Sequence, residues 1–367
     1  MYMYSTRITH VRPEIECMGA YLPGESLESF STRTGIPVDQ LIKLNSNESP
    51  FGPVPSVMSA LGDYSSYNNY PDTSSTALRA ALSDYTGLDS RYIVLSHGSN
   101  ELINLLWHIF LSPGDTIISC PPTFSLYTSL TALCGASMIE VPRTVDYRVD
   151  VKGVLAALTP STKLMVLCSP NNPTGNSIVE DDVLALLVPG RIVVVDEAYV
   201  EFSSQPQGFA HLVPRYPNLV VLRSFSKWAG LAGLRIGYGL FPAWIAHYML
   251  RAQCPFEVNV AGHIAAIETL AHLELVLANV QRIVCERERL LEVLHGQPYL
   301  EPFPSQGNFI LARVHDAKIE QVRAVVEEHG ILLRYFEQPA MRDFLRVTVG
   351  LPEHTDRLAE ALARVKS

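Results

Sequence analysis

One lysine, Lys227, stands in a segment whose composition suits chemistry on a carbonyl group. Ser224 and Ser226 precede it, a glycine-rich stretch follows it, and Arg235 comes eight residues later. An amine attacks a carbonyl only when it is unprotonated, and a nearby cation such as Arg235 lowers its pKa. The two hydroxyls and the guanidinium can hold a phosphate dianion, and glycines let backbone approach a ligand closely. The segment therefore predicts a site for a covalently held aldehyde that bears a phosphate, although a solvated loop can have the same local composition.

Other polar side chains follow runs that read as buried strands. Asp196 ends the apolar run 192–195, and Asn172 lies in a proline-rich turn after the run 164–168. An acid at the carboxyl end of a parallel strand points into the crevice where α/β proteins bind ligands, and there it can pair with a protonated ring nitrogen. Asn172 supplies a side-chain donor at the strand ends, and Tyr199 can donate to a ring oxygen. A helix-capping acid and a plain turn are the ordinary alternatives.

An anion site and a stacking surface are predicted upstream. Ser99 and Asn100 come between the strand 92–96 and a helix at 102–111, where free backbone N–H groups and the helix dipole favour a phosphate. Phe124 follows a further strand and can stack on a flat ring, or belong to the core.

Two arginines near the C-terminus, Arg334 and Arg346, lie in or beside strand-like runs with apolar neighbours. A buried arginine needs an anionic partner. That partner can be the carboxylate or phosphate of a substrate, or an acid of the protein itself.

The elements that must position these residues predict an α/β protein. Between residues 75 and 258 short apolar runs alternate with helical patterns, which is typical of a mostly parallel sheet wrapped by helices. A helical stretch at 261–294 then leads into a smaller α+β region. We expect an N-terminal arm (1–45) on the small domain or a partner subunit, a large domain (46–258) and a small domain (259–367). The remaining predicted strands are 116–120, 219–224, 236–240, 308–314, 331–336 and 344–349, and the small-domain helices are 317–329 and 353–365.

Composition excludes several classes of protein. The 367 residues carry a net charge of -9 without a basic cluster, so a nucleic-acid partner is not expected. Six cysteines without a C-x-x-C pair predict buried, reduced thiols and no metal site. No run has the length of a membrane span or the pattern of a signal peptide. We expect a cytoplasmic protein without a membrane partner.

In this order, the segments resemble the class I/II aminotransferases, which are fold-type I pyridoxal-phosphate enzymes. The resemblance runs from Val11-Arg12-Pro13 to the segment 346–350. Within that superfamily the chain is most similar to the histidinol-phosphate aminotransferases. The motifs that carry this similarity are Tyr21-Leu22-Pro23-Gly24, the segment 44–53 (LNSNESPFGP) and Tyr70-Pro71-Asp72.

The resemblance implies a role for each candidate residue. Lys227 would form the Schiff base with pyridoxal 5'-phosphate and then move the substrate proton, while Asp196 would keep the ring nitrogen protonated. Asn172 and Tyr199 would hold the ring hydroxyl, and Phe124 would stack on the ring. The cofactor phosphate would bind Ser99, Asn100, Ser224, Ser226 and Arg235, with Tyr70 supplied by the neighbouring subunit of a homodimer. Substrate contacts would come from Tyr21, Asn47, Arg334 and Arg346.

The implied reaction is ping-pong transfer of an amino group from histidinol phosphate to 2-oxoglutarate through pyridoxamine phosphate, in histidine biosynthesis. One departure concerns the donor: Glu257 stands where the family often has asparagine, and in the substrate cavity it would favour a cationic group. It can instead face solvent or pair with Arg251. Two alternatives stay open: a decarboxylase or an elimination or cyclisation enzyme acting on a phosphorylated or guanidino amino acid, and a non-catalytic ligand sensor.

Overall fold

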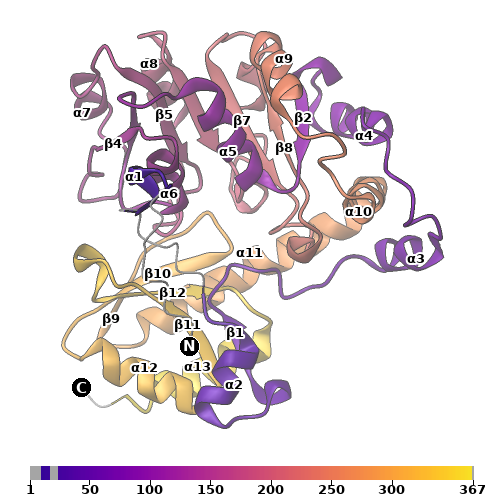
Figure 1. Ribbon diagram of the computed structural model, residues 1–367. Helices are drawn as coiled ribbons and strands as arrows, with labels where there is room; N and C mark the ends of the chain where they lie inside the picture. Colours follow the sequence, from indigo (N-terminus) through magenta and orange to yellow (C-terminus); the bar gives the residue numbers. More distant parts are fainter. Residues whose placement is uncertain (1–9, 17–23, 366–367) are drawn as a thin grey trace.

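The computed structural model describes residues 10–16 and 24–365, and its elements gather around two β-sheets. Figure 1 shows the larger sheet with its helices in the upper half of the molecule and the smaller sheet in the lower half. The long helix α11 (Leu273–His295) runs along the boundary between them.

The larger sheet is mostly parallel, as predicted. Its strands are β2 (Ile93–Ser96), β3 (Thr116–Ser119), β4 (Ser137–Glu140), β5 (Thr162–Cys168), β6 (Ile192–Asp196), β7 (Leu219–Ser224) and β8 (Gly237–Leu240). They lie in the order β2-β8-β7-β6-β5-β3-β4. β8 is antiparallel to both neighbours, whereas every pair from β7 to β4 is parallel. Burial on both faces explains why β5, β6 and β7 read as continuous apolar runs.

The smaller sheet takes one strand from the N-terminal arm. Its strands are β1 (Ile42–Leu44), β9 (Leu300–Pro302), β10 (Phe309–Val314), β11 (Ile331–Tyr335) and β12 (Phe344–Thr348), in the order β1-β11-β12-β10-β9. β1 pairs parallel to β11, with Ile42 opposite Ile331, and the other pairs are antiparallel. Arg33, in α2 (Leu27–Thr34), forms a 2.6 Å ion pair with Glu327. These contacts tie residues 27–44 to the small sheet.

The beginning of the described chain lies elsewhere. α1 (Pro13–Glu16) packs on α6 (Leu126–Leu133) beside the larger sheet, and Arg12 donates to the carbonyl of Leu133 at 2.6 Å. The domain bounds 1–45, 46–258 and 259–367 stay a prediction.

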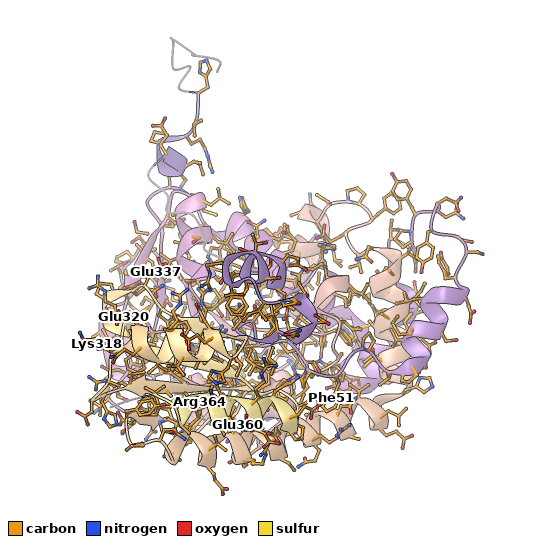
Figure 2. All side chains as sticks on the ribbon, turned by 90° about the horizontal axis from the view of Figure 1, so that it is seen from below. Phe51, Lys318, Glu320, Glu337, Glu360 and Arg364 are labelled. Carbon is orange, nitrogen blue, oxygen red and sulfur yellow. The ribbon has the colours of Figure 1, made fainter. Side chains whose placement is uncertain are left out.

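The remaining helices cover the sheets. They are α3 (Pro55–Asp63), α4 (Thr76–Thr86), α5 (Ser99–Phe110), α7 (Val151–Ala156), α8 (Glu180–Leu187), α9 (Ala243–Ala252), α10 (Val260–Ala271), α12 (Ile319–Glu328) and α13 (Pro352–Leu362). Charged side chains labelled in Figure 2, among them Lys318, Glu320 and Glu360, lie on the outer face of α12 and α13. The helical stretch predicted at 261–294 is divided at His272, where α10 and α11 meet at a bend of 85°. Within the described ranges no single helix is long and apolar enough to cross a membrane, and α10 and α11 meet that criterion only as this bent pair.

The cysteine prediction is only partly right. Cys120, Cys134 and Cys168 are buried free thiols, but Cys254 and Cys285 are exposed. Cys285 lies on an exposed side of α11, and Cys254 lies in the loop after α9. Apolar neighbours in the sequence do not reveal which side chain of a helix or loop faces solvent.

Candidate active site

The strand register gathers the candidate residues at one edge of the larger sheet. Ser96, which ends β2, and Ser224, which ends β7, both pair with Gly237 at the start of β8. Cys168, which ends β5, pairs with Asp196, which ends β6. The loops that follow these four strands therefore meet at the carboxyl edge, where open α/β sheets bind ligands.

Lys227 lies in the loop that follows β7. Its Nζ donates a 2.9 Å hydrogen bond to the carbonyl oxygen of Ser46. Desolvation lowers the pKa of Lys227 to about 8, and the positive charges of Arg346 and Arg235 lower it further against the opposing effect of Glu48. A useful fraction of this amine is therefore unprotonated near neutral pH, which is what attack on a carbonyl requires.

Asp196 is 4% exposed and has neutral hydrogen-bond donors around it. Its Oδ2 accepts from the hydroxyl of Tyr127 at 2.7 Å, and its Oδ1 accepts from the N–H of Ala198 at 3.2 Å. Burial raises the pKa of Asp196 to about 6, and these two hydrogen bonds oppose that rise. The group is consequently a buried carboxylate at neutral pH, able to pair with a cation such as a protonated ring nitrogen.

Tyr127 was not among the residues predicted from sequence. It lies in α6, 69 residues from Asp196 along the chain. A tyrosine in an amphipathic helix is usually a core residue, so no local signal distinguished this one. Phe124, which was predicted to stack on a ring, packs edge-on against Tyr127 with 5.5 Å between ring centroids.

An anion cradle forms where β2, β8 and the start of α5 meet. Gly98 has a φ of +86° and directly precedes α5, and a Cβ placed on it would lie 2.6 Å from Nη2 of Arg235. A Cβ on Gly237 would lie 2.5 Å from the backbone nitrogen of Ser99. The guanidinium therefore packs directly against the N-terminal turn of a helix, and free N–H groups with an arginine are the donor set that phosphate prefers.

The polar residues of the cradle differ in how far they are buried. Ser99, Ser224 and Ser226 are buried, and the N–H of Ser226 donates to Oγ of Ser224 at 3.1 Å. Asn100, the next residue after Ser99, is exposed.

An alanine at Gly98 is expected to weaken binding of pyridoxal phosphate to the apoprotein by about tenfold or more, because the added Cβ displaces Arg235 and charge-assisted hydrogen bonds are lost. Gly114 provides the matched control, since its φ of +91° brings the same backbone strain but no atom of the described part of the chain lies within 4 Å of its Cβ position. Equilibrium binding of the cofactor to both variants checks this. Equal loss in the two would attribute the effect to backbone strain alone.

The other candidate side chains form a linked hydrogen-bond network. Asn47, 1% exposed, donates through Nδ2 to the hydroxyl of Tyr199 at 3.1 Å. Arg346 donates through Nη1 to Oδ1 of Asn172 and through Nη2 to the carbonyl of Asn45 at 2.7 Å. Residues predicted to hold the ring and residues predicted to hold the substrate are thus in direct contact.

Arg334 lies directly opposite Arg346 in the antiparallel pairing of β11 and β12. Arg346 is 7% exposed and its positive charge acts on Lys227. Two arginines opposite each other on adjacent strands, one of which acts on the charge of Lys227, are a suitable receptor for an anionic group of a substrate.

One predicted residue, Tyr70, lies apart from this cluster among the described residues. Tyr70 is 79% exposed, and its ring stacks on Phe256 at 4.2 Å. Tyr21 lies outside the described residues.

Glu257 lies beside the loop before α5. Desolvation and the charge of Glu101 raise its pKa, and a hydrogen bond from the backbone of His97 and the charge of that histidine oppose the rise. The neighbours that act on it therefore do not include Arg251, the partner considered from sequence.

Glu257→Asn is expected to change the ratio of kcat/KM between phosphorylated and cationic donors by less than about fivefold, because the charges that act on this half-buried carboxylate are those of Glu101 and His97, beside α5. Donor competition assays on wild type and variant measure it. A tenfold or larger move from cationic to phosphorylated donors would place Glu257 in the donor pocket.

Comparison with known proteins agrees with this geometry. The family model for aminotransferase class I and II matches residues 39–362. A histidinol-phosphate aminotransferase of Dehalococcoides mccartyi is 41% identical over 356 residues, which cover 97% of this chain and 98% of that protein. A histidinol-phosphate aminotransferase of Roseiflexus castenholzii is 43% identical over 364 residues, again covering 97% and 98%.

A solved structure has the same fold. The histidinol-phosphate aminotransferase of Sinorhizobium meliloti in complex with pyridoxal-5'-phosphate superposes with a TM-score of 0.88 and 26% identity, covering 97% of each chain. The amine of Lys227, the uncompensated carboxylate of Asp196 and the anion cradle at Gly98 match the aldehyde, the ring nitrogen and the phosphate of that cofactor. The chain belongs to the class I and II aminotransferases, and its site fits pyridoxal phosphate.

Proposed function

We propose that this chain transfers the amino group of histidinol phosphate to 2-oxoglutarate, with pyridoxal phosphate as cofactor. The observation that carries the proposal is the partly buried amine of Lys227, with its lowered pKa, at the same sheet edge as the carboxylate of Asp196 and the anion cradle of Gly98 and Arg235. The histidinol-phosphate aminotransferases that are 41% and 43% identical over nearly the whole chain support the choice of donor.

Lys227 carries the proton-transfer work in this proposal. Pyridoxal phosphate, when bound, supplies a reactive aldehyde and a ring that withdraws electrons from the substrate. An amine with a pKa of about 8 can take a proton from the donor carbon and return it elsewhere near neutral pH. A hydrogen bond to the carbonyl oxygen of Ser46 holds Nζ of Lys227 in place between proton transfers.

The remaining cofactor residues bind and orient. Asp196 holds the proton on the ring nitrogen, and Tyr199 with Asn172 orients the ring oxygen. Phe124 would stack on the ring face. The phosphate is held by the buried donors at Ser99, Ser224 and Ser226, by Arg235 and, at the exposed rim, by Asn100.

Both substrates present an anion to the same arginines. Histidinol phosphate has no α-carboxylate, so Arg334 and Arg346 hold its phosphate, and they hold a carboxylate when 2-oxoglutarate enters. Asn47 and Tyr21 complete this pocket. The contact between Arg346 and Asn172 couples the bound anion to the cofactor ring.

A homodimer with shared sites belongs to the proposal. Tyr70 is 79% exposed, although its ring is stacked on Phe256 and so presented in a defined direction. An exposed, ordered aromatic is a common interface residue. Tyr70 then reaches the cofactor phosphate of the neighbouring subunit.

The test is to incubate the cofactor-loaded protein with 2-oxoglutarate and one donor at a time, and to measure glutamate, carbon dioxide and inorganic phosphate. Histidinol phosphate should yield glutamate in stoichiometric amount without release of phosphate. Carbon dioxide or phosphate from threonine phosphate, without glutamate from any donor, would favour the decarboxylase or elimination alternative. Turnover of a guanidino amino acid but not of histidinol phosphate would refute the proposed donor.

A further inference from the structure

Tyr127 is held in a fixed position against Asp196. Its ring is fully buried, and its hydroxyl donates to Oδ2 of Asp196 at 2.7 Å. Thr131, one turn further along α6, donates to the carbonyl of Tyr127 at 2.8 Å and accepts from Nε1 of Trp107 at 3.0 Å. The turn that carries Tyr127 is therefore anchored to α5, and the phenol meets the carboxylate in one geometry.

Glu197, the residue after Asp196, is also a buried acid, but a charged side chain of the protein pairs with it. Glu197 is 1% exposed, and its carboxylate accepts from Nε of Arg223 at 2.8 Å and from the N–H of Phe209 at 2.7 Å. Its charge is neutralised within the protein. Asp196 instead accepts from the neutral Tyr127 hydroxyl and a backbone N–H, so its charge stays available for an incoming cation.

We propose that Tyr127 is a positioning residue, whose hydroxyl keeps Asp196 ionised and oriented toward the ring nitrogen of the cofactor without neutralising it. This inference rests on the proposed function of the site. A hydrogen bond to the charged form of a buried acid favours that form, which is needed to hold a proton on the ring nitrogen. Burial raises the pKa of the Tyr127 phenol well above its ordinary value, so the phenol stays neutral and does not compete for that proton.

The test compares two ligands on Tyr127→Phe. Equilibrium binding to the apoprotein is measured for pyridoxal phosphate and for an analogue in which carbon replaces the ring nitrogen. We expect the affinity for pyridoxal phosphate to fall by about tenfold, since a hydrogen bond to a charged group is lost, and the affinity for the analogue to change by less than about twofold. The acid limb of pyridoxal phosphate binding should move to higher pH, because Asp196 is then more easily protonated.

Tyr299→Phe is the matched control. It removes a buried tyrosine hydroxyl that donates at 2.7 Å to the carbonyl of Leu362, in the small-sheet region, and it should change neither affinity. Equal losses for both ligands in Tyr127→Phe, or no loss for either, would overturn the inference. As a second variant, Tyr127→Phe added to Asp196→Asn should cause no further loss, and a full additional loss would also overturn it. If wild type binds pyridoxal phosphate but does not use histidinol phosphate, the proposed function fails while this comparison of ligands still stands.

Discussion

Replacing Lys227 with alanine is expected to lower kcat for transfer from histidinol phosphate by about 10³-fold or more, because the group that moves the substrate proton is removed. The amine is already held 2.9 Å from the carbonyl oxygen of Ser46, and its pKa of about 8 leaves it partly unprotonated at neutral pH. Single-turnover kinetics with the donor measure the effect on the chemical step. Small primary amines added to the variant should restore part of the rate, since they can occupy the space left by the side chain.

The control for this experiment is Lys163→Ala. Lys163 is an exposed residue at the start of β5, the end of that strand opposite the site, and lies 3.6 Å from Asp115, so its removal should leave kcat unchanged. A Lys227→Ala protein that kept a tenth or more of the wild-type kcat would refute the central assignment.

Replacing Glu201 with glutamine is expected to make the free energy of unfolding much less dependent on pH between 5 and 9. Glu201 is 5% exposed, and within residues 10–16 and 24–365 neither of its carboxylate oxygens has a hydrogen-bond partner. The nearby Arg223 binds Glu197 instead. Burial raises the pKa of Glu201 to about 8, against an ordinary value of 4.5 in the unfolded chain.

The sign of the effect follows from proton binding. Between pH 4.5 and 8 the folded chain keeps a proton on Glu201 that the unfolded chain releases, so the wild-type free energy of unfolding falls as pH rises. The stability is fully present below pH 4.5 and is lost as pH rises through about 8, a total on the order of 4 kcal/mol. Glutamine has no proton to lose, so Glu201→Gln should be more stable than wild type above pH 8.

Chemical denaturation at pH 6 and pH 9 checks this prediction. Glu360→Gln is the control, because Glu360 is exposed on α13 (Figure 2) and its replacement should leave the pH dependence of wild type unchanged. If Glu201→Gln and wild type differ in stability by the same amount at both pH values, Glu201 is not a buried neutral acid.

Much of the larger sheet was predictable because its strands are buried on both faces and therefore read as uninterrupted apolar runs. The strand at 219–224 was predicted with the observed bounds. β4 was missed because it is an edge strand of partly exposed residues, and β1 and β9 were missed because three residues are too few for a recognisable pattern. The break at His272 was also missed, since both helices continue the same apolar periodicity across it.

Some residues of the candidate site could likewise be predicted from the sequence, and others could not. Asp196 was identified because it ends an apolar strand, and a residue at a strand end takes its place from the strand itself. Lys227 was identified from the serines, the glycines and Arg235 that surround it in the sequence. Tyr127 could not be identified, because its partner is 69 residues away and the contact depends on where α6 packs. The sequence also could not predict that Glu201 lacks a hydrogen-bond partner among the described residues, because this depends on Arg223 binding Glu197 instead.

By itself, the sequence determined the kinds of chemical groups present and their positions at the ends of strands, because burial and strand period act over a few neighbouring residues. Only the tertiary structure decided which groups meet. The strand order β2-β8-β7-β6-β5-β3-β4 brings Arg235 onto Gly98 and places Asp196 beside the loop that carries Lys227. The packing of α6 then gives Asp196 a neutral phenol, whereas the pairing of β6 with β7 brings Arg223 to Glu197. Such pairings arise from contacts between distant segments, and those depend on the three-dimensional arrangement of the whole sheet and its helices.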